Sequence, residues 1–173
     1  IQDDRRHFTV VKKEGGVLES RLDLSPELKG VLRQSFRKAG ESAWIYDLEF
    51  TEDPGYAAVH VAVDMSAEAA RFVNKEMLIG GTSFRFPAEV LKKKNPFHLL
   101  WKKTKSVTFI LENSSVTFRS DHDFGVLIQD DRATGGSVFT VRLVLPEKNA
   151  AGKYHQRFTV IEKPHRIQPL DLR

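Results

Sequence analysis

Short alternations of apolar and polar residues run through most of this chain and predict a β-rich protein. In these segments β-branched and aromatic residues recur at every second position, and polar turns separate them about every ten residues in the second half. The predicted strands cover residues 7–11, 17–24, 44–50, 56–63, 82–91, 97–101, 106–111, 116–119, 124–128, 137–145 and 154–161. After residue 82 the pattern predicts no helix.

Two segments in the first half have helical spacing instead. The first, 25–39, begins at Ser25, which caps free N–H groups, continues with Pro26 at the first helical position, and ends at Gly40. Its apolar residues fall on one helical face: Leu28, Val31, Leu32, Phe36 and Ala39. The second, 66–78, has a similar inward face: Ala69, Ala70, Phe72, Val73 and Met77. We therefore expect two helices before the β-rich second half.

The shift in pattern near residue 80 predicts an α+β fold that is β-rich. Residues 1–100 would form a mixed N-terminal lobe with the two helices, and residues 101–173 an antiparallel β-barrel. No linker rich in Ser, Gly or Pro separates the two parts, so we expect them to pack closely.

The composition is that of a globular protein and excludes several kinds of chemistry. The chain has 173 residues, of which 40% are apolar and 29% are charged, and it contains no Cys. Disulfides, thiolate nucleophiles and Cys-based zinc sites are therefore excluded, which fits a cytoplasmic protein. No apolar run reaches the ~18 residues that span a bilayer. The chain opens at Ile1 without a signal peptide, which indicates a piece of a longer protein.

A cluster of lysines is the main charge feature of a chain whose net charge is +4. Its members have no acidic residue among them: Lys92, Lys93, Lys94, Lys102, Lys103 and Lys105. Such a cluster attracts phosphate or an acidic partner, or forms a solvated rim between strands. Phe97 and Trp101 interrupt it, and aromatic rings beside a basic groove are one mode of nucleic-acid binding. The alternation of Phe97, Leu99 and Trp101 favours a single inward face, so nucleic acid ranks low among the partners.

Signatures of catalysis are weak in this sequence. It has no Gly-x-Ser-x-Gly elbow and neither of the common Gly-rich phosphate loops. His60 falls within an alternating strand. Asp121, His122 and Asp123 are adjacent in a strand-like turn, so their side chains point to different sides and do not converge on a metal ion. We expect a non-enzymatic protein that needs no metal or other cofactor.

The turn at 130–136 is the segment whose residues indicate a site. It joins two apolar runs, and its glycines permit positive φ and the close approach of another molecule. The stretch Asp131-Arg132-Ala133-Thr134-Gly135-Gly136 resembles the Asp/Asn-x-Ser/Ala-x-x-Gly turn of the PilZ domain, a small β-barrel family associated with cyclic di-GMP. The likeness covers residues 100–161. Residues 82–105 resemble the end of the barrel that precedes a PilZ domain in flagellar-brake-type proteins.

The resemblance implies a regulatory binding module of bacterial second-messenger signalling, and one departure implies weak or lost nucleotide binding. Where the family has Arg-x-x-x-Arg, this chain has Lys102-Lys103-Thr104-Lys105-Ser106. Lysine meets phosphate as a point charge and lacks the planar guanidinium that forks to phosphate and stacks on guanine. By the resemblance, the ligand-binding residues are Lys102, Lys103 and Lys105 for phosphate and Asp131, Ala133 and Gly136 for a guanine edge or a close-packed backbone.

Two other functions stay open. One is a structural or protein-docking domain that uses residues 97–105 as its docking strip, and the other is a basic nucleic-acid-binding module. The ligand-site hypothesis requires that the lysines and the turn at Asp131 face one common surface.

Overall fold

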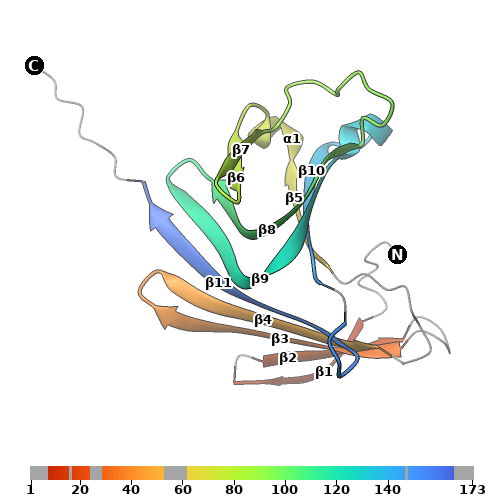
Figure 1. Ribbon diagram of the computed structural model, residues 1–173, viewed down its shortest axis with the longest axis vertical. Helices are drawn as coiled ribbons and strands as arrows, with labels where there is room; N and C mark the ends of the chain where they lie inside the picture. Colours follow the sequence, from red (N-terminus) through yellow and green to blue (C-terminus); the bar gives the residue numbers. More distant parts are fainter. Residues whose placement is uncertain (1–7, 16, 24–28, 53–61, 147, 166–173) are drawn as a thin grey trace, which may run out of the picture.

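The computed structural model describes residues 8–15, 17–23, 29–52, 62–146 and 148–165, and joins their strands into one antiparallel sheet (Figure 1). The first half holds β1 (Phe8–Glu14), β2 (Val17–Asp23), β3 (Lys29–Gly40), β4 (Ala43–Glu52) and β5 (Ala62–Glu68). A short helix, α1 (Ala69–Phe72), precedes β6 (Glu76–Ile79) and β7 (Thr82–Arg85). The second half holds β8 (His98–Ile110), β9 (Ser114–Asp130), the 3-10 turn η2 (Asp131–Thr134), β10 (Val138–Val144) and β11 (Lys153–Pro164).

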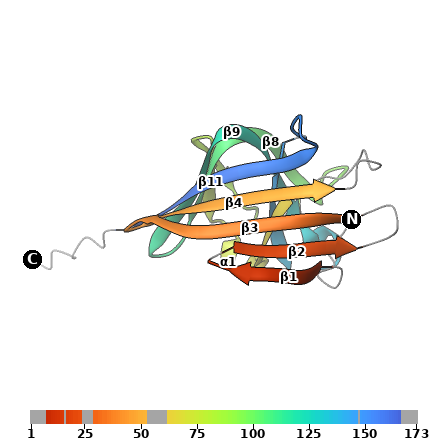
Figure 2. The same ribbon diagram turned by 90° about the horizontal axis from the view of Figure 1, so that it is seen from below.

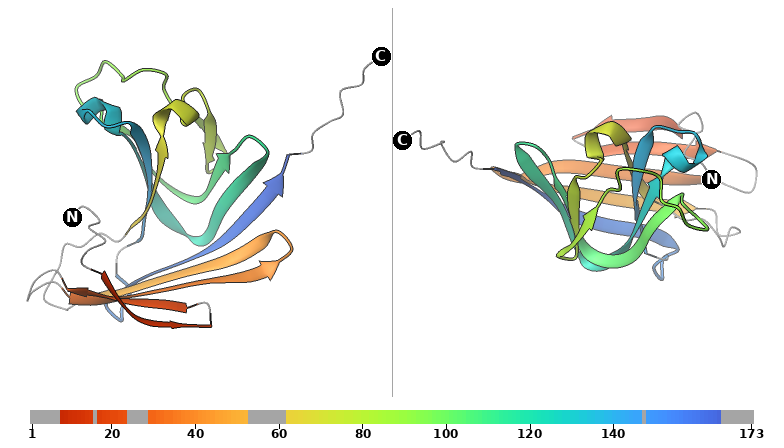
Figure 3. Two further views of the ribbon diagram at one scale, coloured as in Figure 1. Left: turned by 180° about the vertical axis from the view of Figure 1, so that it is seen from behind. Right: turned by 90° about the horizontal axis from the view of Figure 1, so that it is seen from above.

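The strand order brings the last strand of the chain into the middle of the sheet. β1 to β4 follow one another in sequence order, β11 pairs with β4, and β9, β8, β6 and β7 continue from there. β10 pairs with both β9 and β5. In Figure 2, β1 to β4 and β11 lie side by side as one layer. Figures 1 and 3 show that β8 and β9 curl away from this layer and carry β5, β6, β7 and β10 with them.

A bend in β9 produces this curl. Residues 114–119 of β9 pair with β11, whereas residues 125–130 pair with β10. Between them the register with β8 jumps, since Thr104 pairs with Phe124 and Ser106 pairs with Arg119. The additional residues on β9 form a bulge, which bends the strand and increases its twist.

The hydrophobic core fills the inside of the curl. Its buried members include Met77, Ile79, Phe86, Val107, Phe124, Val126, Ile128, Phe139, Val141, Leu143, Phe158 and Val160. Phe158 of β11 joins the two parts, because its ring centroid lies 5.0 Å from that of Phe124 and 6.3 Å from that of Tyr46. Burying each large aromatic ring removes ~150–250 Å² from water, so these contacts account for much of the packing between β4, β9 and β11.

The α+β prediction is wrong, because neither predicted helix forms within the described residues. Residues 29–40 are strand β3, which pairs with β2 on one side and β4 on the other. Residues 66–78 are divided among β5, α1 and β6. The mixed N-terminal lobe with two helices is thereby corrected to strands of the common sheet.

The first helix prediction fails because its residues pair with a strand on each side. Along β3, Arg33 and Ser35 face one side of the sheet and Phe36 faces the other, and Arg33 Nε donates to Glu19 Oε2 at 2.7 Å. Pairing with two neighbours satisfies the backbone of β3 on both edges. This gain from distant segments outweighs a local helix preference, which is a weak determinant by itself.

The strand predictions for the second half are largely confirmed. Strands predicted at 137–145 and 154–161 match β10 and β11, while the predicted pairs at 97–111 and 116–128 are each one long strand, β8 and β9. β7 is shorter than predicted and ends at Arg85. The strand predicted at 56–63 falls mostly outside the described residues. β8 runs across the predicted domain boundary after residue 100, and β11 pairs with β4, so strands from both predicted domains share the sheet.

Candidate functional site

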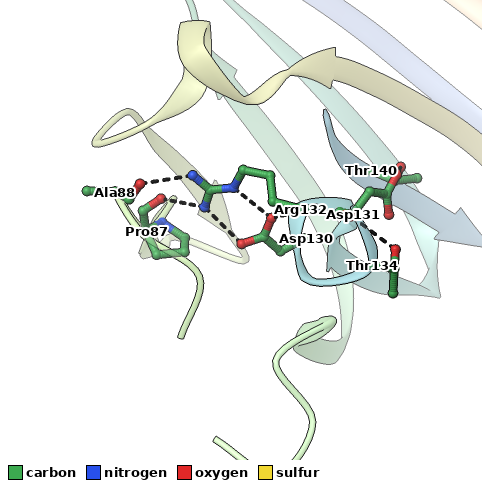
Figure 4. Close-up of polar contacts among 7 residues, drawn as sticks. All are labelled: Pro87, Ala88, Asp130, Asp131, Arg132, Thr134 and Thr140. Atoms are coloured by element: carbon green, nitrogen blue, oxygen red, sulfur yellow. Dashed lines mark hydrogen bonds and ion pairs between the residues drawn. The ribbon is translucent and has the colours of Figure 1, made fainter. Parts of the chain in front are cut away.

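The turn between β9 and β10 is closed on itself (Figure 4). The N–H of Gly136 donates to the carbonyl of Asp131 at 2.8 Å, and the hydroxyl of Thr134 donates to the same carbonyl at 3.0 Å. A Cβ on Gly136 would lie 2.9 Å from the Cβ of Asp131, so this approach requires glycine. Gly135 takes the left-handed conformation with φ of 88°, and Ala133 is half-buried within the turn.

The side chain of Asp131 is bound by the neighbouring strand. Its Oδ2 accepts a hydrogen bond from the hydroxyl of Thr140 on β10 at 3.1 Å, and Thr140 is buried. The structure thus brings Asp131, Ala133 and Gly136 together in one turn, as the sequence predicts. Their contacts hold the turn against β10.

Arg132, which no sequence pattern indicates as a functional residue, anchors this turn to a distant segment. Its Nη1 donates to the carbonyl of Ala88 at 2.9 Å, and its Nη2 donates to the carbonyl of Pro87 at 3.0 Å (Figure 4). The guanidinium carbon lies 4.6 Å from the ring centroid of Phe139, within cation–π range. No local pattern indicates a partner more than forty residues upstream, so sequence reasoning had no signal for this contact.

The charge of Arg132 is balanced by Asp130, whose side chain is fully buried. Two parallel hydrogen bonds join them, Nε to Oδ1 and Nη2 to Oδ2, each 2.8 Å long. These bonds raise the pKa of Arg132 above its ordinary value. Four hydrogen bonds thus tie the guanidinium to groups of the fold, and it is a positioning group rather than an open anion site.

The three predicted phosphate lysines lie on β8 in different environments. Lys102 is half-buried, and its Nζ donates to the carbonyl of Ile79 at 3.3 Å and to the hydroxyl of Thr82 at 3.2 Å. Lys103 and Lys105 are exposed. Lys105 lies opposite the β9 bulge, whose exposed residues Asp121 and Asp123 reduce the local positive charge. Lys103 is therefore the predicted lysine best placed to meet an anion.

The pairing of β8 with β9 separates the lysines from the turn. Lys103 pairs with Gly125, and Asp131 follows six residues later along the chain. Six residues of extended strand cover about 20 Å. The structure therefore does not gather the six predicted residues into one cluster, and their joint role in ligand binding stays a prediction.

Trp101 faces outward, against the inward face predicted for it. The residue is 55% exposed. The reason is a β-bulge at Leu99, since His98 pairs with Gln129 and Leu100 with Ile128, which shifts the alternation by one position. The indole packs on the backbone of Gly125, where a Cβ would collide with its six-membered ring.

The exposed surface around this ring, called the Trp101 face below, is the outer side of β8, β9 and β10. It includes Trp101 and Lys103 of β8 and Leu127 of β9, with Arg142 of β10 opposite Leu127. A depression of about 280 Å³ lies beside the indole, and it is lined by His98, Leu99, Leu100, Trp101 and Leu127. The face thus combines an apolar, aromatic centre with basic side chains.

The outer side of the layer formed by β2, β3, β4 and β11 differs, because its charges are paired. Asp47 accepts hydrogen bonds from His155 Nε2, at 2.6 Å, and from Arg157. Partial burial acts to raise the pKa of Asp47, but the hydrogen bonds and charges of Arg157 and His155 together lower it below 3.8. Lys153 pairs with Glu49 in the same way. These ion pairs join neighbouring strands and partly neutralise one another's charge.

Two further structural observations concern metal binding and helices that could cross a membrane. Within the described ranges, no three side chains of His, Cys, Asp or Glu come together in a way that would hold a metal ion. The helices of the same ranges are too short to cross a bilayer.

Comparison with known proteins adds no relative. No model of a known protein family matches the chain, and a search of curated proteins finds no similar sequence.

Proposed function

We propose that this protein is a non-enzymatic regulatory binding module, and that it receives a nucleotide ligand on the Trp101 face. The observation that carries the proposal is the placement of Trp101, which is 55% exposed on a strand surface and lies beside the exposed Lys103. Glycine at position 125 lets the indole lie against the strand backbone, so the ring is held in place.

The chemistry of the face matches the two parts of a nucleotide. A base can stack on an indole without any specific hydrogen bond, and such stacking contributes about 1–3 kcal/mol per base. Lys103 is exposed and supplies a positive charge for phosphate. Both contacts tolerate many bases, which favours modest affinity and little sequence selectivity.

Cyclic di-GMP is the first nucleotide to test, because of the resemblance of the turn at 131–136 to the PilZ turn. We expect weak binding or none at the turn itself. Asp131 already accepts from Thr140, Gly136 packs on Asp131, and Lys102 is bound to the β6–β7 hairpin. A ligand at the turn would have to displace these internal contacts, whereas the Trp101 face needs no rearrangement.

Isothermal titration calorimetry with cyclic di-GMP and with mononucleotides tests the proposal, together with quenching of tryptophan fluorescence. We expect weak, salt-sensitive binding that quenches fluorescence and that Trp101→Ala and Lys103→Glu abolish. Phe36→Ala and Lys163→Glu are matched controls, because Phe36 is 53% exposed on β3 and Lys163 is exposed on β11. The proposal fails if nucleotides bind equally well to the wild type and to both Trp101-face variants, or if no nucleotide binds at low salt.

A protein-docking role is the second candidate, and the apolar depression next to Trp101 favours it. Such a role predicts that the Trp101 face binds its protein partner without any dependence on phosphate. Titration with phosphate-free nucleosides separates the two, because a nucleotide receptor loses most of its affinity when the phosphate is removed.

A further inference from the structure

We infer that the Trp101 face is one end of a longer track for a single-stranded polynucleotide, which continues onto the loop of residues 89–97, called the lysine loop below. The inference rests on the proposed function and names the class of ligand for that surface. The alternation of Phe97, Leu99 and Trp101 predicts an inward face and so gives nucleic acid a low rank among the partners. The exposed position of Trp101 removes that reason.

The first step is the position of the lysine loop, which is fixed at both ends beside the start of β8. At its beginning, Arg132 binds the carbonyls of Pro87 and Ala88. At its end, the N–H of Asp130 donates to the carbonyl of Phe97 at 2.8 Å. Figure 1 shows the loop running from β7 toward η2 and returning into β8. The loop therefore lies at the upper end of the same strands that form the Trp101 face.

The second step is the charge that the loop presents. Lys93 folds back, and its Nζ donates to the carbonyl of His98 at 2.6 Å, so this ammonium group lies next to the depression beside Trp101. Lys92 and Lys94 are exposed on the same loop, and Glu89 is its single acidic residue. Positive charge thus continues from Lys103 past the indole to the loop.

The distance along β8 between the lysine loop and Lys103 is too long for a single phosphate group. From His98 to Lys103 the strand covers about 17 Å. One phosphate group cannot reach the loop lysines and Lys103 together, whereas a polynucleotide carries a phosphate at every unit. A basic track with an aromatic ring part-way along it is the arrangement that binds single strands with little sequence preference.

An anionic membrane is the rival partner, because Val90 and Leu91 are exposed beside the loop lysines. Two observations favour the polynucleotide. The indole of Trp101 packs on Gly125 within the sheet surface, and Lys93 is tied back to the strand instead of extending from the loop. Both features suit a ligand that lies along β8 more than a bilayer that the loop tip would enter.

Fluorescence anisotropy with labelled oligothymidylates, from the dinucleotide to about a dozen nucleotides, tests the inference. We expect affinity to rise with length until the track is filled and to fall linearly with the logarithm of salt concentration. Trp101→Ala should weaken binding about five-fold to 150-fold. Lys92→Glu and Lys103→Glu should each reduce the salt slope by about 0.7 or more, while Lys163→Glu leaves it unchanged. Thermal unfolding of each variant shows whether it is folded.

The outcomes separate this inference from the function on which it rests. Affinity that is the same for a mononucleotide and for the longest strand overturns the polynucleotide and leaves a nucleotide receptor. Length-dependent binding that Lys92→Glu does not weaken overturns the role of the lysine loop. Binding to vesicles of anionic lipid, with no binding to any oligonucleotide or nucleotide, overturns both proposals.

Discussion

Arg132 holds both carboxylate oxygens of Asp130 in a fork of two hydrogen bonds, each 2.8 Å long, although the two residues are separated by only one position. Because the same guanidinium also binds the carbonyls of Pro87 and Ala88, the pair joins the β9–β10 turn to the start of the lysine loop. Asp130 is fully buried, and Arg132 supplies its counter-charge.

Arg132→Met should therefore lower the free energy of unfolding by about 3–5 kcal/mol, because it leaves a buried carboxylate without its counter-charge. Urea denaturation measures this loss. Arg85→Met is the matched control, since Arg85 pairs with Glu76 in an exposed setting where such a pair contributes about 0–1 kcal/mol. Equal losses in the two variants would show that the buried pair does not anchor the turn.

Gly30→Ala should destabilise the sheet by about 1–3 kcal/mol, as overpacking of a filled site does. A Cβ at Gly30 would lie 2.5 Å from the ring of Phe50 and 2.5 Å from the carbonyl oxygen of Thr51 on β4. Gly40→Ala is the control on the same strand, because its Cβ would meet Ala43 at an ordinary 3.6 Å. Thermal unfolding of both variants measures the difference. If both unfold at the wild-type temperature, β3 does not pack on β4 as described.

The sequence predicts most strands of the second half because their signals are local. Period-two alternation and polar turns are visible in a few consecutive residues, and β10 and β11 follow them closely. The turn at 131–136 is also local, since Gly136 must be glycine for reasons that lie within the turn.

The predictions that are wrong concern residues whose structure depends on partners far away along the chain. β3 is a strand because β2 and β4 pair with it, and the apolar spacing of residues 28–39 does not contain that information. Trp101 points outward because of the bulge at Leu99, which depends on how β9 pairs with β8. The contact of Arg132 with Pro87 likewise depends on the folded chain.

The protein should lose stability in acid, because the stabilising carboxylate of Asp47 becomes protonated there. Its pKa in the folded state is below the ordinary 3.8, because the bonds from Arg157 and His155 outweigh its partial burial. A carboxylate of this kind contributes its full stabilisation above its unfolded pKa and loses it as pH falls through the folded pKa. Denaturant unfolding should therefore show Asp47→Asn less stable than wild type above pH of about 5, with the two curves converging below pH 3.8.

The exposed Asp121 provides the comparison for this acid prediction. Asp121→Asn should change the free energy of unfolding at neutral pH by no more than about 0.5 kcal/mol, as surface substitutions usually do. A constant difference between Asp47→Asn and wild type down to the lowest pH would mean that the carboxylate charge of Asp47 does not contribute to stability.

At the alkaline end, Tyr46 should resist ionisation. Burial raises the pKa of Tyr46 to about 12, and its hydroxyl donates to Gln34 Oε1 at 2.9 Å. Between its unfolded value of 10.0 and its folded value, the unfolded chain releases a proton that the folded chain keeps, so stability falls as pH rises across this interval.

One such proton changes the unfolding free energy by about 1.4 kcal/mol per pH unit. Tyr46→Phe should remove this contribution to the slope and should remove one tyrosinate from the absorbance titration above pH 10.0. At neutral pH the variant should lose only about 1 kcal/mol, the usual contribution of one hydrogen bond. An unchanged alkaline slope, or an unchanged absorbance titration above pH 10.0, would place the hydroxyl of Tyr46 in contact with water instead of against Gln34.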